Sequence, residues 1–157
     1  MGAEAQLAGS NAATVQVDVA SGLSVTTMTD LSFGTVVQSA GAVTLTNTSA
    51  GIGKFRINGQ QNRNVQVTLL APAVLTSGAN AIVYAPAAGY NQTADQPSAL
   101  TGTFTFVGGV STATMQLADK SPPGAAGQAF VYIYGGIDVG AVPAGTYVGQ
   151  FTMTAAY

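Results

Sequence analysis

The sequence predicts an all-β fold built as an antiparallel β-sandwich, and three observations lead to this expectation. Apolar and polar residues alternate with a period of two along most of the chain, whereas the 3.6-residue period of an amphipathic helix is scarce. Threonine, valine and aromatic residues, which favour strands, supply this alternation, and Gly, Pro and Asn separate the segments. About nine or ten short strands result, and no helical segment is long enough to connect parallel ones.

Short apolar runs predict the strands of the first half of the chain. Residues 14–19 (TVQVDV) alternate strictly and predict a strand with one apolar face, which carries Val15, Val17 and Val19. Gly22 interrupts this run, and an extended path follows it. Further extended segments are expected at residues 23–33, 43–45, 55–57, 65–69 and 82–84.

Turn-forming residues separate these segments. Asn58-Gly59 favours a tight turn after the strand at 55–57, and Ser77-Gly78 favours another turn before the strand around 82–84. Residues 86–99 contain two prolines and a glycine, so we expect a longer surface excursion there.

The second half of the chain contains the clearest hairpin signal. Gly108-Gly109 lies between two valines, where a two-residue turn needs the positive φ that glycine adopts without strain. Residues 121–127 predict a loop, and residues 130–134 (FVYIY) are apolar on both faces, which predicts a strand buried on both sides or at an interface. The last strand follows Pro143 and places Tyr147, Gly149, Phe151, Met153, Ala155 and Tyr157 on one face.

Charged residues are few, since four Lys or Arg and six Asp or Glu give a net charge of −2. The four cations, Lys54, Arg56, Arg63 and Lys120, form no basic stripe, so we expect neither a nucleic-acid partner nor a polybasic membrane-binding surface. No apolar run reaches about 18 residues, so we also expect no membrane span.

The residue types required by common catalytic sites are missing. Histidine and cysteine are absent, which removes thiol nucleophiles, histidine bases, zinc sites and iron–sulfur clusters. We therefore expect no metal, no cofactor and no enzymatic activity, although two carboxylates that meet in space would still suit glycoside hydrolysis. The carboxylates are scattered and lack the spacing of a calcium loop: Glu4, Asp18, Asp30, Asp95, Asp119 and Asp138.

The length of 157 residues predicts one domain, residues 21–157, preceded by an N-terminal extension, residues 1–20. The extension lacks a charged segment followed by an apolar stretch, so we expect a signal peptide to be absent or already removed. Asn47 and Asn91 each begin an N-glycosylation tripeptide in a predicted loop.

The strand at residues 14–19 has two possible partners, its own sandwich or a neighbouring subunit, and the sequence leaves both open. A sandwich that lacks one strand exposes an apolar groove and unpaired strand edges, both of which favour association with another chain. Burying three valines in such a groove would contribute roughly 1.5 to 3 kcal/mol each before entropy costs.

Two phrases at opposite ends of the chain resemble bacterial chaperone–usher pilins and, more closely, an uncharacterised family of secreted bacterial domains that shares their pattern. The phrase LSVTTMTDLSFGTV resembles an extended strand leading to a Leu-x-Phe-Gly turn, here Leu31, Phe33 and Gly34. The phrase AGTYVGQFTMTAAY resembles the last pilin strand, with Gly145 and a terminal tyrosine, Tyr157.

This resemblance implies an immunoglobulin-like sandwich that lacks one strand, which the N-terminal extension of the next subunit supplies. It also implies a periplasmic chaperone and an outer-membrane usher as partners, beside identical subunits in a head-to-tail homopolymer. By resemblance, Val15, Val17 and Val19 are donor residues, and the strand that borders the acceptor groove contains Gly145, Tyr147, Gly149, Phe151, Met153 and Tyr157.

The function expected from these observations is that of an exported structural subunit in an extracellular filament, a pilus or fimbria at the cell surface that serves adhesion or biofilm formation. The alternative is a secreted sandwich that completes itself and binds carbohydrate or a surface partner. Its binding loops would be residues 86–99 and 121–127.

Overall fold

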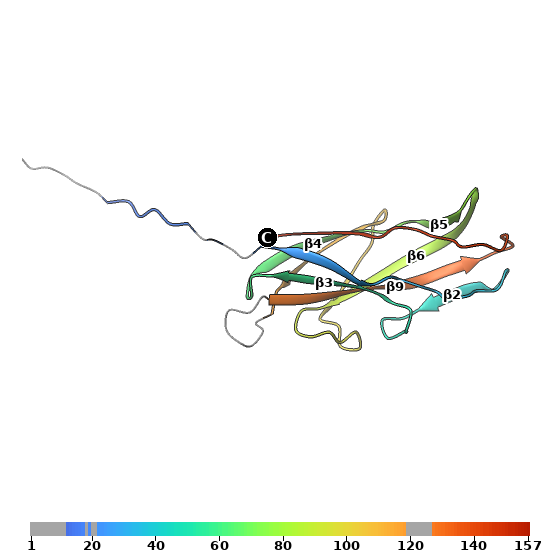
Figure 1. The fold of residues 1–157 in the computed structure, drawn as a ribbon, viewed down its shortest axis with the longest axis horizontal. Helices are drawn as coiled ribbons and strands as arrows, with labels where there is room; N and C mark the ends of the chain where they lie inside the picture. Colours follow the sequence, from blue (N-terminus) through green and yellow to red (C-terminus); the bar gives the residue numbers. More distant parts are fainter. Residues whose placement is uncertain (1–11, 18, 20–21, 119–126) are drawn as a thin grey trace, which may run out of the picture.

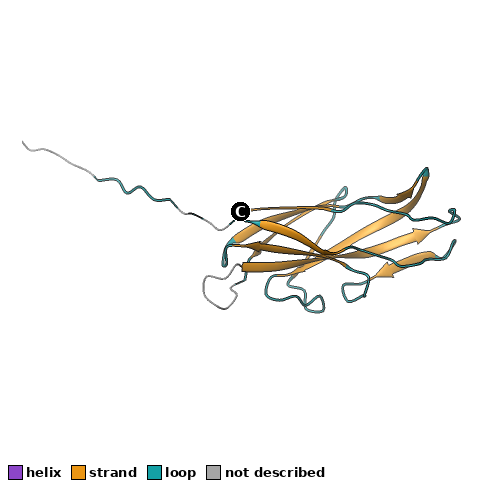
Figure 2. Cartoon of the chain, viewed as in Figure 1, coloured by secondary structure: helices purple, strands orange, loops and turns teal. Residues whose placement is uncertain are grey.

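The computed structural model describes residues 12–17, 19, 22–118 and 127–157, and this part of the chain is all-β, without a helix, which confirms the predicted fold class at that level (Figure 2). All strand pairings are antiparallel. The strands are β1 (Ser24–Thr29), β2 (Gly41–Leu45), β3 (Gly53–Gly59), β4 (Asn64–Leu70), β5 (Val74–Ser77), β6 (Asn80–Asn91), β7 (Gly102–Phe104), β8 (Val110–Gln116), β9 (Gly127–Val139) and β10 (Thr152–Ala156) (Figure 1).

The strands form two sheets. The larger sheet has the order β1-β3-β9-β6-β5, with β2 added along the second half of β9 and β7 added along β6, whereas the smaller sheet has the order β10-β4-β8. The larger sheet curls until β5 meets the segment before β10, where Thr76 and Val148 exchange two backbone hydrogen bonds of 2.8 and 2.9 Å. The C-terminal segment therefore touches the larger sheet before it joins the smaller one.

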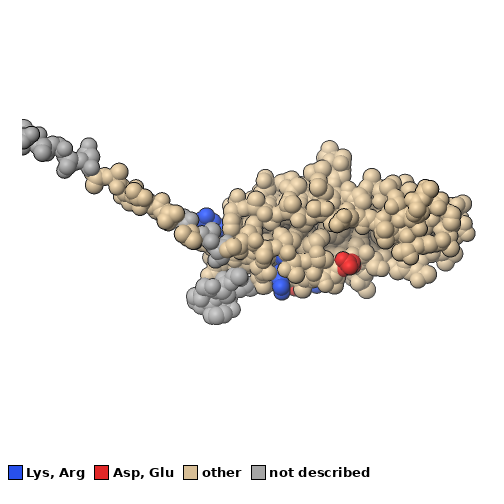
Figure 3. Space-filling model, turned by 45° about the horizontal axis from the view of Figure 1, so that its top comes forward, with Lys and Arg blue, Asp and Glu red and all other residues tan. Residues whose placement is uncertain are grey.

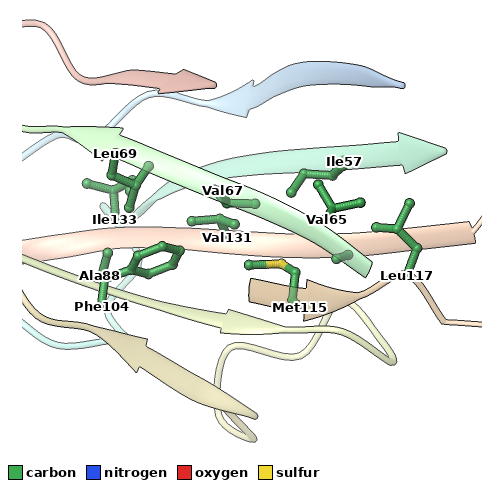
Figure 4. Packing of buried hydrophobic residues seen from close by; sticks show 11 residues of the cluster. Ile57, Val65, Val67, Leu69, Ala88, Phe104, Met115, Leu117, Val131 and Ile133 are labelled. Atoms are coloured by element: carbon green, nitrogen blue, oxygen red, sulfur yellow. The ribbon is translucent and has the colours of Figure 1, made fainter. Parts of the chain in front are cut away.

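Strand β9 is the most buried strand of the larger sheet and confirms the prediction for residues 130–134. Val131 and Ile133 face the smaller sheet, while Phe130 and Tyr132 pack on the opposite side of β9 with Ile52. Figure 4 shows side chains of β4 beside those of β9, in the layer between the two sheets. This main core consists of Ile57, Val65, Val67, Leu69, Ala88, Phe104, Met115, Leu117, Ala129, Val131 and Ile133.

Two predicted strand ends, at Asn58-Gly59 and at Pro86, are wrong, because the strands continue through this glycine and this proline. Asn58-Gly59 lies inside β3, and the turn follows at Asn62, which has a φ of 60°. A Cβ on Gly59 would lie 2.7 Å from side-chain atoms of Leu117 and Tyr157, so close approach requires this glycine. Residues 86–91 belong to β6, so the surface excursion begins only after Asn91.

The predicted Gly108-Gly109 turn is confirmed, but its two arms enter different sheets. Both glycines have positive φ values, 60° and 79°, and the flanking valines exchange backbone hydrogen bonds of 2.9 and 3.1 Å. Strand β7 pairs with β6, whereas β8 pairs with β4, so this turn carries the chain from the larger sheet to the smaller one. The loop predicted at 121–127 lies, up to residue 126, outside the described residues.

Replacing Gly135 with alanine is expected to destabilise the fold by about 2 to 3 kcal/mol. Gly135 lies opposite Pro86, has a φ of 126°, and a Cβ there would overlap the carbonyl oxygen of Ala85. Chemical denaturation measures the change. The matched control is Gly140→Ala, where a Cβ meets no atom within 4 Å; equal stability of both variants would contradict the strain at Gly135.

Candidate strand-accepting groove

A long groove of about 880 Å³ separates two segments of the chain that approach each other without pairing. One wall is residues 27–36, the end of β1 and the segment after it, and the other wall is residues 142–151, which lead into β10. We call this feature the groove. Its floor comes from the larger sheet and contains Phe55, Leu75, Ile82, Tyr84, Ile133, Ile137 and Val139.

The floor of the groove is apolar because aromatic rings and buried aliphatic side chains form it, whereas the walls also carry threonines, Gln150 and Asp30. The ring of Tyr84 meets the rings of Phe33 and Phe151 edge to face, at centroid distances of 6.1 and 6.2 Å. The Tyr84 hydroxyl donates a 2.6 Å hydrogen bond to the Tyr134 carbonyl oxygen, and burial raises the pKa of this phenol above its ordinary value. The one polar group of this side chain is thus satisfied away from the groove.

Backbone groups on the walls point into the groove without a strand to receive them. The Val148 amide and carbonyl bond to Thr76, so the amides and carbonyls of Tyr147 and Gly149 point the opposite way, toward the groove. Strand β1 pairs with β3 alone. Within the described residues no ladder connects the two walls, so the edge of β1 and the irregular segment before β10 face each other along an apolar floor.

The structure brings four of the six expected groove residues together. Gly145, Tyr147, Gly149 and Phe151 all line the groove. The two remaining residues follow along the chain but lie outside the groove, Met153 within β10 and Tyr157 after it. Met153 packs against the core between the sheets, and the Tyr157 hydroxyl accepts a 2.8 Å hydrogen bond from the Gln60 amide.

The second wall and the floor were not predicted as site residues. Leu31 and Phe33 line the groove. The sequence analysis identified their segment as an extended strand leading to a turn, but gave these residues no role in a site. Ile82 and Tyr84 belong to a strand that the sequence predicts, but the sequence does not indicate which distant segments this strand faces. The sequence signal that could have identified the second wall is the group of apolar residues just after Asp30, namely Leu31, Phe33 and Val36.

The expected donor residues lie in an extension that leaves the body of the molecule (Figure 1). Val15, Val17 and Val19 are 95%, 81% and 82% exposed. The described residues among 14–19 form no strand within this chain, because a strand needs a partner and none of the described edges pairs with them; pairing with a neighbouring subunit stays a prediction. Asp18 lies outside the described residues.

The two glycosylation tripeptides begin with asparagines that hold the loop 92–101 in place. Asn91 is 3% exposed, and its side-chain nitrogen donates to the Gln96 and Ala99 carbonyls at 3.3 and 2.7 Å, so its expected position in an open loop is wrong. Asn47 donates to the Pro97 carbonyl oxygen at 2.7 Å. Both side-chain amides serve loop structure here.

The same loop carries the ion pair of the described region. Lys54 Nζ lies 2.8 Å from Asp95 Oδ2, and Asp95 Oδ1 accepts a 3.1 Å hydrogen bond from the buried Tyr132 hydroxyl. Burial, then this hydrogen bond, raises the pKa of the Tyr132 phenol. The loop therefore covers the outer side of β9, away from the groove.

No metal-ligating cluster of three or more His, Cys, Asp or Glu residues occurs in the described part of the chain, nor does any helix that could cross a membrane. Asp30 is the charged residue that lines the groove. Comparisons with protein-family models, characterised proteins and solved structures find no match to this chain.

Replacing Phe151 with alanine is expected to lower the free energy of unfolding by about 2 kcal/mol, because its ring contacts Tyr84 and Phe106 and bridges two clusters of the core. Urea denaturation measures this loss. Val148→Ala, at a wall residue that is 62% exposed, serves as the control and should change stability by less than about 0.5 kcal/mol. Equal losses would mean that Phe151 does not support the floor.

Proposed function

We propose that this chain is the structural subunit of an extracellular filament, polymerised head to tail by donor-strand exchange. Its body would be an immunoglobulin-like sandwich that lacks one strand, completed by residues 14–19 of a neighbouring copy. One observation carries the proposal: a groove with an apolar floor, between two walls that no ladder connects, occurs in the same chain as an exposed extension with alternating valines.

The two parts match in length and in chemistry. The ten residues from 142 to 151 span roughly 33 Å when extended, and the eight residues from 12 to 19 span roughly 26 Å. Alternation directs the valines to the floor and Thr14 and Gln16 to solvent. The incoming strand would also pair with the free backbone groups of both walls, which no compact apolar ligand does.

The geometry also favours one direction for the proposed donor. The extension leaves at the end of the body where the C-terminus lies (Figure 1). Because residues 142–151 run toward the C-terminus and residues 27–36 run away from the start of β1, Val36 and Val142 lie at the opposite end of the groove. In a filament of equally oriented copies, the donor therefore enters at the Val142 end and runs parallel to β1 and antiparallel to residues 142–151. An extension that folded back onto its own body about Gly22 would run in the reverse direction.

The groove also supports the assembly partners that we propose. Exposed apolar surface with free strand edges promotes unspecific association before a donor arrives. An exported chain of this kind would therefore need a protein that covers the groove until exchange, the role expected of a periplasmic chaperone, with an outer-membrane usher as the place of exchange. The assembled filament would function in adhesion or biofilm formation at the cell surface.

The donor assignment predicts that Val17→Asp blocks polymerisation, because a carboxylate in the apolar groove would lack both water and a partner. Gln16→Asp introduces the same charge on the opposite side of the extension and should leave filaments unchanged. Negative-stain microscopy, followed by electrophoresis with and without boiling, measures the outcome. Filaments of Val17→Asp with native resistance to heat would refute the donor assignment.

A peptide of residues 12–19 should bind the Val17→Asp chain and raise its thermal unfolding temperature, because the groove of this variant is intact. The same peptide with Asp at position 17 is the control and should have no effect. Stabilisation by both peptides would show that the apolar face of the donor does not enter the groove.

The direction of the donor can be tested with introduced cysteines, because the chain contains none. A copy with Val19→Cys, mixed with a copy with Val142→Cys, should form a cross-linked dimer with a short thiol reagent. Val19→Cys mixed with Thr27→Cys should not, since Thr27 lies toward the other end of the groove. Cross-linking inside a single chain that carries both Val19→Cys and Thr27→Cys would instead support a folded-back extension.

A further inference from the structure

The valines of the extension emerge beside a part of the body that has no groove. Figure 3 shows the described residues of the extension projecting away from the body. Residues 20–23 alone separate Val19 from the start of β1 at Ser24, whereas the part of β1 that lines the groove begins at Thr27. On the facing side the groove ends at Phe151, just before β10. The extension therefore leaves next to the junction of β1 and β10, which we call the seam.

The seam is too narrow to admit a further strand. Within the described residues β1 and β10 form no ladder with each other, yet some of their Cα atoms lie within 8 Å of one another. A strand inserted between two others needs two strand spacings, about 9.6 Å. Leu23, Met153 and Ala155 also pack against the main core at the seam. A donor strand can therefore be received only in the groove, beyond Thr27 and Phe151.

An extension that folded back on its own body would bring its valines to the seam instead of the groove. In an antiparallel hairpin with residues 20–22 as its turn, each valine faces a residue near the start of β1. The opposed pairs would be Val19 with Leu23, Val17 with Val25, and Val15 with Thr27. Residues 6–13 (QLAGSNAA) would face most of the groove, and Leu7 is their one large apolar residue. Such a hairpin would leave the apolar floor almost uncovered.

The length of the connection leads to the same conclusion. Thr27 lies roughly 14 Å from Leu23 along β1, and the connection from Leu23 back to Val19 also spans roughly 14 Å when fully extended. No length remains for the reversal of direction or for the lateral step of about 4.8 Å to the next strand position. Val19 therefore cannot enter the groove of its own chain.

We propose that the closed seam and the short connection prevent the chain from filling its own groove, so that the groove stays open for the extension of another copy. This inference rests on the proposed filament function and names what selects exchange between chains over closure within one chain. A donor from another copy enters at the Val142 end and does not pass the seam, so the restriction does not act on it.

A polymer of this kind needs such a restriction. A donor tethered to its own body by a flexible connection has an effective concentration in the millimolar range, far above that of donors on other copies in dilute solution. If the tethered donor reached the groove, most chains would close on themselves before exchange. A connection too short for closure removes this competitor without weakening the match between valines and floor.

The test lengthens the connection. Twenty Gly and Ser residues inserted between Ser21 and Gly22 give a tether of roughly 80 Å, whereas the far end of the groove at Val36 lies roughly 45 Å from Leu23. The valines can then enter their own groove in either direction. We expect monomers in size-exclusion chromatography and a filament yield at least roughly tenfold below that of the native chain. The control, the same insertion between Asn11 and Ala12, should leave the filament yield unchanged.

Thermal unfolding then shows whether the valines occupy the groove. The lengthened chain should unfold at a higher temperature than the Val17→Asp chain, and adding Val17→Asp to the lengthened chain should remove this gain. A lengthened chain that forms filaments with native yield, or that gains no stability, would overturn the inference and leave the filament proposal standing. A stabilised monomer of the lengthened chain, together with an absence of native filaments, would support the inference and overturn the filament proposal alone.

Discussion

Backbone hydrogen bonding at strand edges is the constraint on which this molecule depends. Strand β9 lies between β3 and β6, and this pairing fixes the larger sheet. Two other edges are partly satisfied: Val148 exchanges backbone hydrogen bonds with Thr76 of β5, and the Gln92 side-chain oxygen accepts a hydrogen bond from the Gln116 amide at the end of β8. At the groove no ladder connects the two walls, and on this feature the proposed strand exchange depends.

The sequence was sufficient for the strands whose pattern depends on local alternation. Residues 65–69 and 130–134 form strands as predicted, because one or both of their faces enter the core. The predicted turn at Asn58-Gly59 and the predicted loop from Pro86 were wrong, because these residues make tertiary contacts inside strands. Gly59 leaves room for side chains of neighbouring segments, and Pro86 lies within β6 opposite a glycine with positive φ. Tertiary contacts of this kind leave no signal in the neighbouring sequence, so the sequence predicted turns at residues that in the structure serve packing.

For the candidate site, the sequence identified one wall and the extension but neither the floor nor the second wall. Gly145, Tyr147, Gly149 and Phe151 follow one another along the chain, so a single pattern groups them. Tyr84 and Ile137 come together with Phe33 only through the curl of the larger sheet. Alternation shows that a residue is buried, but it does not show which distant segments share its cluster.

The position of the extension relative to β1 determines how the body would respond to mechanical load. The extension leads through residues 22–23 into β1, which pairs antiparallel with β3 along the body (Figure 1). Tension applied to the extension along this direction would act parallel to β1, and the hydrogen bonds of the β1–β3 ladder would share it in shear. Peeling would load those bonds one after another instead. The body is therefore arranged to withstand pulling from its N-terminal end better than pulling across its sheets.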